Sequence, residues 1–521
     1  MPYEKRSSAK IRAVLLLCAS VVAHTLRAIA QGPSPSGGSH AVAAPLANSG
    51  RSPQSGSVTA VEAPIAGTTD SINTINPTVN VSGPYSGSAP NASAAAFSGS
   101  LTLRDAIQRG LTYNLGGIGQ SNSVRQAQGQ SQIARSALLP NISGYLAETL
   151  QQVSLAAEGV RIHIPIAGYS FPTLIGPFNN IDLRGSVSQS IFDPTAWNNY
   201  RSTREATHAA QLSARDARDA VVLAVSGTYL QIIATRQRVT AAHAQLDTAT
   251  ALLNQTQQKR DVGLSAQIDV DHSDVEQMTQ QQRVISLETE LAKQKIALAR
   301  LIGLPPNNNY DLADDVPFAA APTLTLDDAI HQALASRADL QAAEAQVRAA
   351  QRTLAAARDE RIPSLSVNGN YGAIGTNPAQ LNATYSAAAT LSIPVWQGGR
   401  TEGDIHQAEA ALSQRQAELA DLRAQVEADV RNAFLDLQAA TSQVTLAQRN
   451  VAVATETLTL TRQRFDAGVT DNVEVVQAQE SLTSAQLDQI NSVFAHNLAK
   501  LSLARAVASA AANLQQFLDL K

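Results

Sequence analysis

The sequence has one cysteine and few charged or aromatic residues, and these absences exclude several classes of protein. Cys18 is the only thiol, so the chain beyond it has no disulfide, cysteine metal ligand or cysteine nucleophile. The formal net charge of −4 provides no basic field, which argues against nucleic acid as a partner. After Ala30 no uninterrupted apolar run reaches the ~18 residues of a transmembrane helix. Any membrane-spanning part must therefore be a β-barrel.

The first thirty residues have the three parts of a secretory signal peptide. An apolar stretch from Val14 to Ala23 precedes the small-residue motif Ala28-Ile-Ala30, and the opening is basic, with Lys5, Arg6, Lys10 and Arg12. Residues 1–30 are therefore predicted to direct export across the inner membrane. The alternative is lipidation at Cys18, although Leu17 before it is larger than the residue that bacterial lipoprotein processing usually needs.

Residues 31–97 form a low-complexity segment that is rich in Ser, Gly, Pro, Ala and Asn and contains hardly any charge. Such a composition cannot bury enough apolar surface to offset the entropy that is lost on ordering. We therefore expect a flexible arm. The alternative is a short added strand within the sequence VNVSGPYSG, at residues 79–87.

An internal repeat divides the rest of the chain into two parts, residues 98–306 and 307–521. Residues 101–107 (LTLRDAI) match residues 324–330 (LTLDDAI) at an offset of 223. Further along the offset is 205, because Asp261-Val-Gly263 matches Asp466-Ala-Gly468. The two offsets differ by 18 residues. This difference must be absorbed after Pro140, where we expect a surface loop in the first repeat.

Each repeat is predicted to begin with a helix and to continue with a β-hairpin. Thr102 and Thr325 have capping-box spacing, and Pro140 and Pro363 end helical patterns of about 37 residues. After each proline, apolar and polar residues alternate, in the segments 181–192, 365–371 and 385–393. Residues 142–153 alternate poorly and are assigned as the fourth strand by symmetry. Strands of about 9–11 residues suit an outer membrane.

A long helix is predicted to follow each hairpin. Asp193 and Pro194 provide an N-cap and a first-turn proline, and no helix breaker follows until Asp261, which gives a length of ~100 Å. Large apolar residues recur every seven positions in both repeats, at Val225, Ile232, Val239, Leu246 and Leu253 and at Val430, Leu437, Val444, Val451 and Leu458. Small residues follow three positions later, which predicts a coiled coil with close backbones. An ordinary helical bundle would share this pattern.

The predicted lengths and the number of strands indicate an assembly of several chains. A helix of about 37 residues precedes each hairpin, and one of about 36 residues, 267–302, returns from the tip, so two shorter helices match one long helix. Four strands cannot close a barrel, and lipid does not tolerate open strand edges, so several chains must share one barrel. A soluble sandwich would explain the alternation but not two hairpins separated by such long helices.

From about residue 100 to the C-terminus, this duplicated order of elements resembles the TolC-like outer-membrane efflux proteins. The resemblance implies a mainly α fold with a small β part, and a homotrimer whose chains share a twelve-stranded barrel and an α-helical tunnel. It further implies a passive channel of a tripartite efflux or type I secretion system, in the outer membrane with its tunnel in the periplasm. The implied partners are outer-membrane lipid, a periplasmic adaptor (membrane fusion) protein and an inner-membrane pump. Neither an enzyme activity nor a cofactor is implied.

The same resemblance assigns functional residues to the two turns between long and returning helices. The family's adaptor-contacting tips correspond to Val262, Gly263, Leu264 and Ser265, and to Ala467, Gly468, Val469 and Thr470. The acidic residues of its periplasmic aperture correspond to Asp269 and Glu474, and a further family aspartate falls on Gln477, so the acidic ring is weaker here. The alternative is that Asp269 and Glu474 only stabilise helix N-termini through the dipole. The run Trp396-Gln-Gly-Gly-Arg400 resembles the family's strand-to-helix corner.

Two competing interpretations remain. Asp269, Asp271, His272 and Asp274 include metal-ligand residue types, but no His-Glu-x-x-His pair exists, so neither a metal site nor a catalytic site is predicted. The alternative function is a secreted periplasmic or surface coiled-coil scaffold or adhesin. Such a protein would also be helical and free of disulfides, but it would not need the alternating hairpins.

Overall fold

The computed structural model describes residues 57–64, 75–89, 99–155, 157, 159, 172–307, 309–319, 324–470 and 472–508. The chain divides into the units Met1–Ala44 and Pro45–Lys521, and every described residue belongs to the second unit. The predicted signal peptide, with Cys18, and most of the longer loop expected in the first repeat lie outside the described residues.

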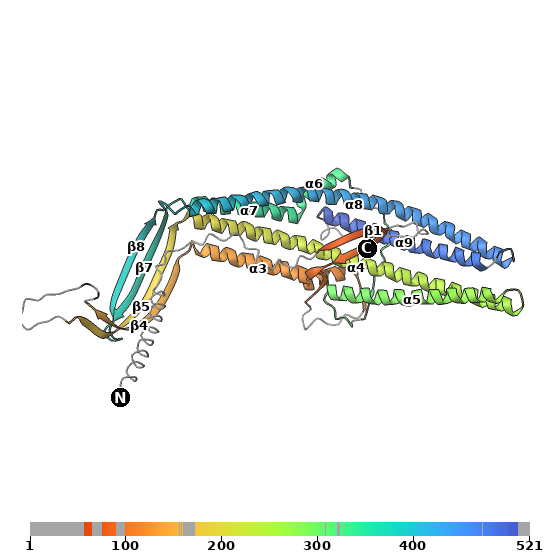
Figure 1. The fold of residues 1–521 in the computed structure, drawn as a ribbon, viewed down its shortest axis with the longest axis horizontal. Helices are drawn as coiled ribbons and strands as arrows, with labels where there is room; N and C mark the ends of the chain where they lie inside the picture. Colours follow the sequence, from red (N-terminus) through yellow and green to blue (C-terminus); the bar gives the residue numbers. More distant parts are fainter. Residues whose placement is uncertain are drawn as a thin grey trace, which may run out of the picture. The chain divides into compact units, whose positions relative to one another are not determined.

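Both repeats contain the predicted order of helix, hairpin, long helix and returning helix (Figure 1). The first consists of α2 (Leu103–Tyr113), α3 (Leu115–Ser136), β4 (Asn141–Ser154), β5 (Leu174–Phe192), α4 (Pro194–Asp261) and α5 (Gln267–Leu301). The second consists of α6 (Leu326–Ser336), α7 (Ala338–Asp359), β7 (Ser364–Gly375), β8 (Asn382–Ser392), α8 (Arg400–Asp466) and α9 (Asn472–Ala506). Two short strands, β3 (Gly99–Leu101) and β6 (Tyr310–Leu312), pair in parallel near the start of each repeat.

The prediction of one unbroken helix before each hairpin is wrong. Asn114 separates α2 from α3, and Arg337 separates α6 from α7, both in extended backbone conformation. The Asn114 side chain is fully buried, accepts from Gly116 N (2.9 Å) and donates to Tyr85 O (2.7 Å). Arg337 instead forms ion pairs with Asp339 (2.6 Å) and Asp429 (2.9 Å). The breaks fall at equivalent positions of the repeats, and tertiary partners stabilise both.

The helices before the hairpin and after the tip lie beside each long helix, as predicted, although the one before the hairpin is divided in two (Figure 1). In the first repeat, Thr207 of α4 donates to Ala127 O of α3 (3.1 Å), and Thr256 of α4 donates to Ser273 of α5 (3.1 Å). In the second repeat α8 packs against α7 and then against α9. The two repeats join because α4 also contacts α7 and α9. The resulting order is α3–α4–α7–α8 near the sheet and α5–α4–α9–α8 near the tips.

The heptads form the contacts between the helices. Most of the predicted positions of α8 are buried in both registers, at Val430, Leu437, Val444 and Leu458 and at Ala433, Ala440, Ala447 and Ala454, whereas Val451 and Thr461 are only partly buried. In the tip half of α4 the small residues are the buried ones, at Ala242, Ala249 and Thr256. Small residues allow the backbones to approach, as in a coiled coil.

The four hairpin strands form one antiparallel sheet with the order β4–β5–β7–β8. Residues that are paired across the strands share a face, and one face is apolar, with Leu146 opposite Leu183, Tyr371 opposite Tyr385 and Leu365 opposite Leu391. The other face is polar, with Ser143 bonded to Ser186 (2.8 Å) and Asn370 to Ser386 (2.6 Å). Strand β4, for which the sequence offers mainly the symmetry of the repeats, is confirmed by its pairing with β5.

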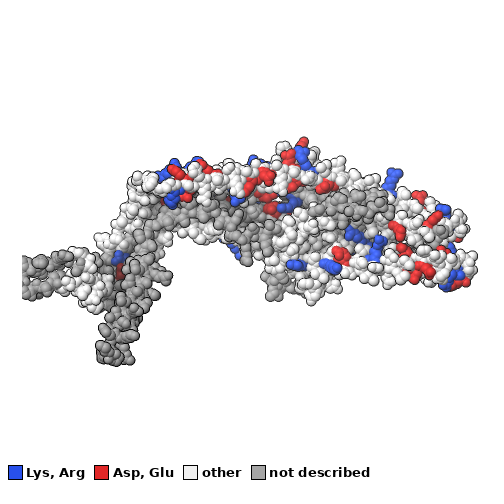
Figure 2. Space-filling model, viewed as in Figure 1, with Lys and Arg blue, Asp and Glu red and all other residues white. Residues whose placement is uncertain are grey.

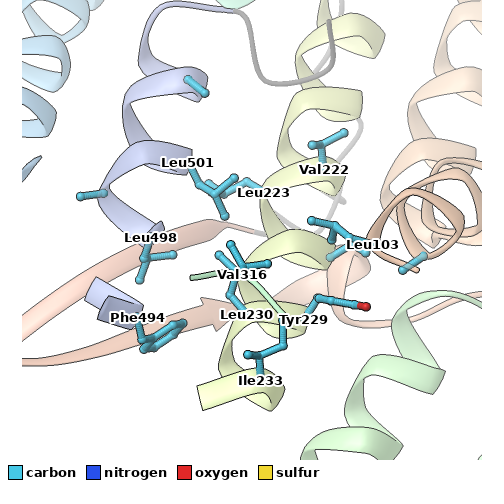
Figure 3. Close-up of a cluster of buried hydrophobic side chains, with 14 of the residues drawn as sticks. Leu103, Val222, Leu223, Tyr229, Leu230, Ile233, Val316, Phe494, Leu498 and Leu501 are labelled. Atoms are coloured by element: carbon cyan, nitrogen blue, oxygen red, sulfur yellow. The ribbon is translucent and has the colours of Figure 1, made fainter. Parts of the chain in front are cut away.

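The main hydrophobic core surrounds the middle of α4 and lies between the two ends of the helical layer. Figure 3 shows side chains from α2, α4 and α9 that point toward one another, with Val316 from the segment that follows β6. Tyr229 is fully buried and donates its hydroxyl hydrogen to Leu101 O (2.8 Å). A window of α4 has a mean hydropathy of 1.2, as high as some membrane spans, but 83% of it is buried within this chain. Packing in this core therefore explains its apolar character.

The expectation of a flexible arm is wrong for part of residues 31–97. The strands β1 (Val58–Pro64) and β2 (Ile75–Val81) form an antiparallel hairpin, and Val58, Ala60, Val79 and Val81 pack against the main core. Gly227 of α4 makes room for this hairpin, because a Cβ at Gly227 would lie 2.7 Å from Val79 Cγ2. Few apolar residues are therefore sufficient to order this hairpin, because they pack on the surface of the main core and need not form a core of their own.

Candidate functional site

The first predicted tip is the turn between α4 and α5. Gly263 has φ = +77°, a conformation that glycine adopts without strain. Its N–H donates to Arg260 O (2.8 Å), and the N–H of Leu264 donates to Lys259 O (2.7 Å). This pair of bonds is the Schellman arrangement that ends a helix. The tip glycine therefore lies at the position of the turn where the positive φ favours glycine.

The second tip repeats this geometry. Gly468 has φ = +72°, its N–H donates to Phe465 O (3.1 Å), and the N–H of Val469 donates to Arg464 O (2.9 Å). The side chains that follow the two glycines extend into solvent, with Leu264 78% and Val469 68% exposed. Exposed apolar side chains at the end of a helical layer are a surface that a partner protein can cover.

The two tips lie together at one end of the helical layer (Figure 1). The Lys259 ammonium lies over the Phe465 ring, 3.6 Å from its centroid, and Gln255 donates to Asp466 (3.0 Å). Below these contacts Leu252 of α4 packs with Leu458 and Val475 of the second repeat. Both tips therefore present one combined surface.

Asp269 stabilises the first turn of α5. Its carboxylate accepts from Ser265 Oγ (2.8 Å) and from the backbone N–H of Ala266 (3.0 Å). The side chain is partly buried. These contacts are those of a residue that caps a helix N-terminus, and they account for the helix-capping interpretation of this acidic position.

Glu474 and Gln477 lie on the exposed side of α9, one turn apart. Glu474 forms an ion pair with Arg464 at the end of α8 (3.3 Å), and both side chains are about half exposed. Such a pair contributes about 0–1 kcal/mol to stability. The charge of Glu474 therefore remains accessible to solvent.

The basic residues at the tips were not predicted from the sequence. Arg464 pairs with Glu474, and Lys259 covers Phe465. The offset of 205 aligns Lys259 with Arg464, so both repeats carry a basic side chain one turn before the tip glycine. That alignment is the signal from which these residues could have been found.

The part of the chain that the structure describes contains no group of three or more His, Cys, Asp or Glu residues arranged to hold a metal ion. His272 is exposed, and Asp271 is instead paired with Gln267 (2.7 Å). The tip region therefore offers contact surface and charge.

Comparison with known proteins assigns the family. The model of the family described as outer membrane efflux protein matches residues 120–304 and 329–509, which cover most of both repeats. The pyoverdine export outer membrane protein OpmQ of Pseudomonas putida is 26% identical over 395 residues, covering 74% of this chain and 81% of that protein. The outer membrane protein TolC of Vibrio cholerae is 24% identical over 331 residues, covering 62% of this chain and 75% of that protein.

The fold is also that of known outer-membrane channels. The Campylobacter jejuni CmeC outer membrane channel matches with a TM-score of 0.69 at 16% identity, covering 87% of this chain and 98% of that chain. The arrangement of helices and strands described above is thus a known architecture. The chain belongs to the outer membrane efflux protein family and is an outer-membrane channel protein with a TolC-like fold.

Proposed function

We propose that the chain is a passive conduit for exported substrates and that it functions as a homotrimer. Three four-stranded sheets would close one twelve-stranded barrel, and three helical layers would continue it as a tunnel. The two tips would contact a periplasmic adaptor protein that connects the channel to an inner-membrane pump. The relatives support export as the activity, because OpmQ is named as a pyoverdine export protein. The proposal includes no catalytic step.

The observation that carries this proposal is the open sheet. In the order β4–β5–β7–β8, the outer edges of β4 and β8 have no partner among the described strands. Unpaired backbone groups cost several kcal/mol each in hydrocarbon, so a sheet in a membrane must close. One face of this sheet is apolar and the other polar, as expected for the outside and the inside of a barrel.

The helical layer also has two unfinished edges, α5 and α8. Each edge helix exposes large apolar side chains, at Ile268, Val275, Met278, Ile285 and Ile296 of α5 and at Leu435, Leu446, Val453 and Leu460 of α8. Many of these residues are seven positions apart, so they form a stripe along each helix. Because α4 and α9 separate the two helices, the stripes can meet only between chains. Burial of these stripes would stabilise a closed ring.

The trimer is tested by native mass spectrometry in detergent, which should give three chains. Leu446→Asp combined with Val453→Asp places two charges in the α8 stripe and should abolish the trimer. Gln448→Asp adds one charge at an exposed position of the same helix and serves as the control. A stable monomer of the unaltered chain that needs no detergent would refute the proposal and favour the scaffold or adhesin.

Docking at the tips is tested by adding bulk at both turns. Gly263→Trp with Gly468→Trp should block export in cells while the trimer still assembles, because both positions are exposed and a Cβ there meets no atom within 4 Å. Gly263→Ala with Gly468→Ala adds the same backbone strain with little bulk, and so separates strain from obstruction. Normal export by the assembled tryptophan variant would exclude the tips as the docking surface.

We further propose that Glu474 and Asp269 line the periplasmic mouth of the tunnel. In a trimer each residue occurs three times around the axis, and like charges in a narrow ring attract cations more strongly than dispersed charges. The exposure of Glu474 supports this role. The cap formed by Asp269 is compatible with this role, because its side chain is only partly buried while it accepts the bonds from Ser265 Oγ and Ala266 N.

A further inference from the structure

A small polar cavity lies between α4, α5 and α9, in the tip half of the helical layer. These three helices belong to both repeats and lie side by side there (Figure 1). The cavity has a volume of about 100 Å³, and the polar residues that line it include Thr248 of α4, Glu276 and Gln280 of α5, and Gln479 and Thr483 of α9. Sites for drug-sized ligands span about 300–1,000 Å³. This cavity is therefore suited to a single ion with a few waters.

Three of the lining side chains are removed from solvent. Glu276, Gln280 and Gln479 are each more than nine-tenths buried. Gln280 Oε1 and Gln479 Nε2 have no hydrogen-bond partner among the described residues. Buried polar atoms of folded proteins nearly always have a partner, which is either protein or bound solvent. The polar groups at this cavity are therefore not satisfied by the described part of the chain alone.

The carboxylate of Glu276 also lacks an opposite charge. Acidic and basic side chains are intermixed on the visible surface of the helical layer (Figure 2), and Glu474, for example, is paired with Arg464 (3.3 Å). Glu276 forms no ion pair with a described residue, and its Oε1 accepts from the neutral Gln280 Nε2 (2.7 Å). A buried carboxylate without a nearby positive charge is unfavourable. A cation in the cavity removes this penalty.

The lining groups have more free oxygen lone pairs than free hydrogens. The hydroxyl of Thr248 donates to Ala244 O (2.9 Å), and that of Thr483 donates to Gln479 O (2.8 Å). Because each hydroxyl hydrogen is used in this way, the lone pairs of both oxygens remain available. A half-turn of the Gln479 amide brings its oxygen to the position of the unpartnered nitrogen. Carboxylate, amide and hydroxyl oxygens are ligands of hard cations.

We propose that this cavity is a binding site for one Ca²⁺ ion, with Glu276 as its charged ligand. Amide oxygens of Gln280 and Gln479, the hydroxyl oxygen of Thr483 and water complete the coordination. Ca²⁺ accepts mixed oxygen ligands in a flexible geometry, whereas Mg²⁺ requires a nearly regular octahedron and keeps several waters. A site with a single carboxylate binds weakly, with a Kd of about 1 mM.

The ion connects the two repeats within one chain. Glu276 and Gln280 belong to α5 of the first repeat, whereas Gln479 and Thr483 belong to α9 of the second. Bound Ca²⁺ therefore stabilises the contact between α5 and α9. Because all protein ligands come from one chain, calcium binding does not depend on the trimer, and a monomer would bind the ion equally well.

Equilibrium dialysis with radioactive calcium tests the site on the full-length protein in detergent, after treatment with a chelator. The parent protein and all variants carry Asp269→Asn and Glu474→Gln, which remove the proposed mouth carboxylates from the measurement. We expect one saturable ion per chain in the parent, and Glu276→Gln should lower the affinity about tenfold or more. Glu290→Gln is the matched control and should bind calcium normally. Glu290 lies on the same helix and accepts from Gln294 (2.9 Å), but it is exposed.

Thermal unfolding of the same proteins supplies an independent readout. Without calcium, Glu276→Gln should unfold at a higher temperature than the parent, because the change removes an uncompensated buried charge. With calcium at about ten times the Kd, the unfolding temperature of the parent should rise and that of Glu276→Gln should not. A glutamate that only packs between the helices would give no such dependence on calcium.

Saturable binding that Glu276→Gln leaves unchanged would overturn the proposal. The absence of saturable binding would also overturn it and would assign the cavity to water, and displacement of calcium by an equal concentration of sodium would indicate a monovalent site instead. Should Glu276→Gln fail to fold, Thr483→Val removes one ligand oxygen at nearly constant side-chain size and should weaken binding severalfold. Unchanged affinity in that variant would contradict the site. None of these results alters the trimer, which native mass spectrometry tests separately.

Discussion

The long helices α4 and α8 are related by duplication, but they have different surroundings. From Ala220 to Thr235 every residue of α4 except Gln231 is buried. The equivalent stretch of α8 buries only one stripe, Val426, Val430, Ala433, Leu437 and Ala440. The two helices share the heptad pattern and have similar lengths. However, α4 passes through the hydrophobic core, whereas α8 packs along one stripe and leaves its other face open.

Small differences between the repeats explain this divergence. Gly227 of α4 accommodates Val79 of the β1–β2 hairpin, whereas the aligned residue of α8 is Asn432, which is exposed. The segment after β6 adds a second cover, through Val316 in the core and through Asp314, which accepts from Leu103 N (2.6 Å). The helix α4 is therefore central because the β1–β2 hairpin and the segment after β6 pack against it.

The largest expected effect is at Tyr229, which the offset of 205 aligns with Phe434. Tyr229 is fully buried, whereas Phe434 is partly buried. Tyr229→Ala should destabilise the protein by about 3–5 kcal/mol because it leaves a cavity, and Phe434→Ala by roughly 1–2 kcal/mol. Thermal unfolding in detergent, followed by circular dichroism, measures both. Equal losses would contradict the contrast between the two helices.

Acid should weaken the core through His496, whose aligned residue in the first repeat is Leu291. Burial and the nearby charge of Lys500 lower the pKa of His496 from 6.5 to about 4, so the folded protein holds the neutral form. Stability that is fully present above pH 6.5 should fall by about 3 kcal/mol as the pH approaches 4, because only the unfolded chain binds the proton there. His496→Leu should flatten this pH dependence in the same unfolding measurement. An unchanged slope would exclude His496 as its source.

The two tip glycines should respond alike, in contrast to Tyr229 and Phe434. Both have positive φ and no neighbour within 4 Å of a built Cβ. Gly263→Ala and Gly468→Ala should therefore each cost about 1 kcal/mol from backbone strain alone. Hydrogen exchange of the Leu264 and Val469 amides, which bond across the turns, reports this local loss. A clear difference between the tips would mean that packing, and not backbone geometry, stabilises one of them.

The smallest effect on stability is expected at the aperture residues. Glu474→Gln removes a half-exposed ion pair with Arg464 and should cost less than about 1 kcal/mol. Its proposed role at the tunnel mouth predicts a larger effect on ion selectivity. Reversal potentials across a salt gradient in planar bilayers should show a weaker preference for cations. Adding Asp269→Asn should weaken that preference further, and block by trivalent cations should weaken in parallel. Unchanged selectivity in both variants would leave helix stabilisation as the only role of these carboxylates.

Much of the fold could be predicted because it depends on local signals. Asp193 accepts from Ala196 N (2.8 Å) and begins α4 as a predicted N-cap. Thr102 and Thr325 cap α2 and α6 in the same way, through Asp105 N and Asp328 N. The helix breaks at Asn114 and Arg337 were missed, because each is stabilised by residues distant in the sequence, such as Tyr85 and Asp429.

At the tips, the turn positions followed from the sequence, but their contacts did not. Gly263 and Gly468 are the residues that the backbone geometry requires. The stacking of Lys259 on Phe465 and the pairing of Arg464 with Glu474 connect different helices, and no local pattern encodes which helices become neighbours. The roles of Asp269, Glu474 and Gln477 at a tunnel mouth remain predictions.

The sequence by itself determined the order of the elements, the heptad seams, the alternating strands and the two glycine turns. These features depend on capping, periodicity and backbone conformation within a few residues, and both repeats carry the same signals. Only the tertiary structure decided that β5 pairs with β7 across the repeats, that the β1–β2 hairpin packs on α4, and that α8 keeps an open face. These outcomes depend on which surfaces meet, because the burial of a residue is a property of its neighbours in space.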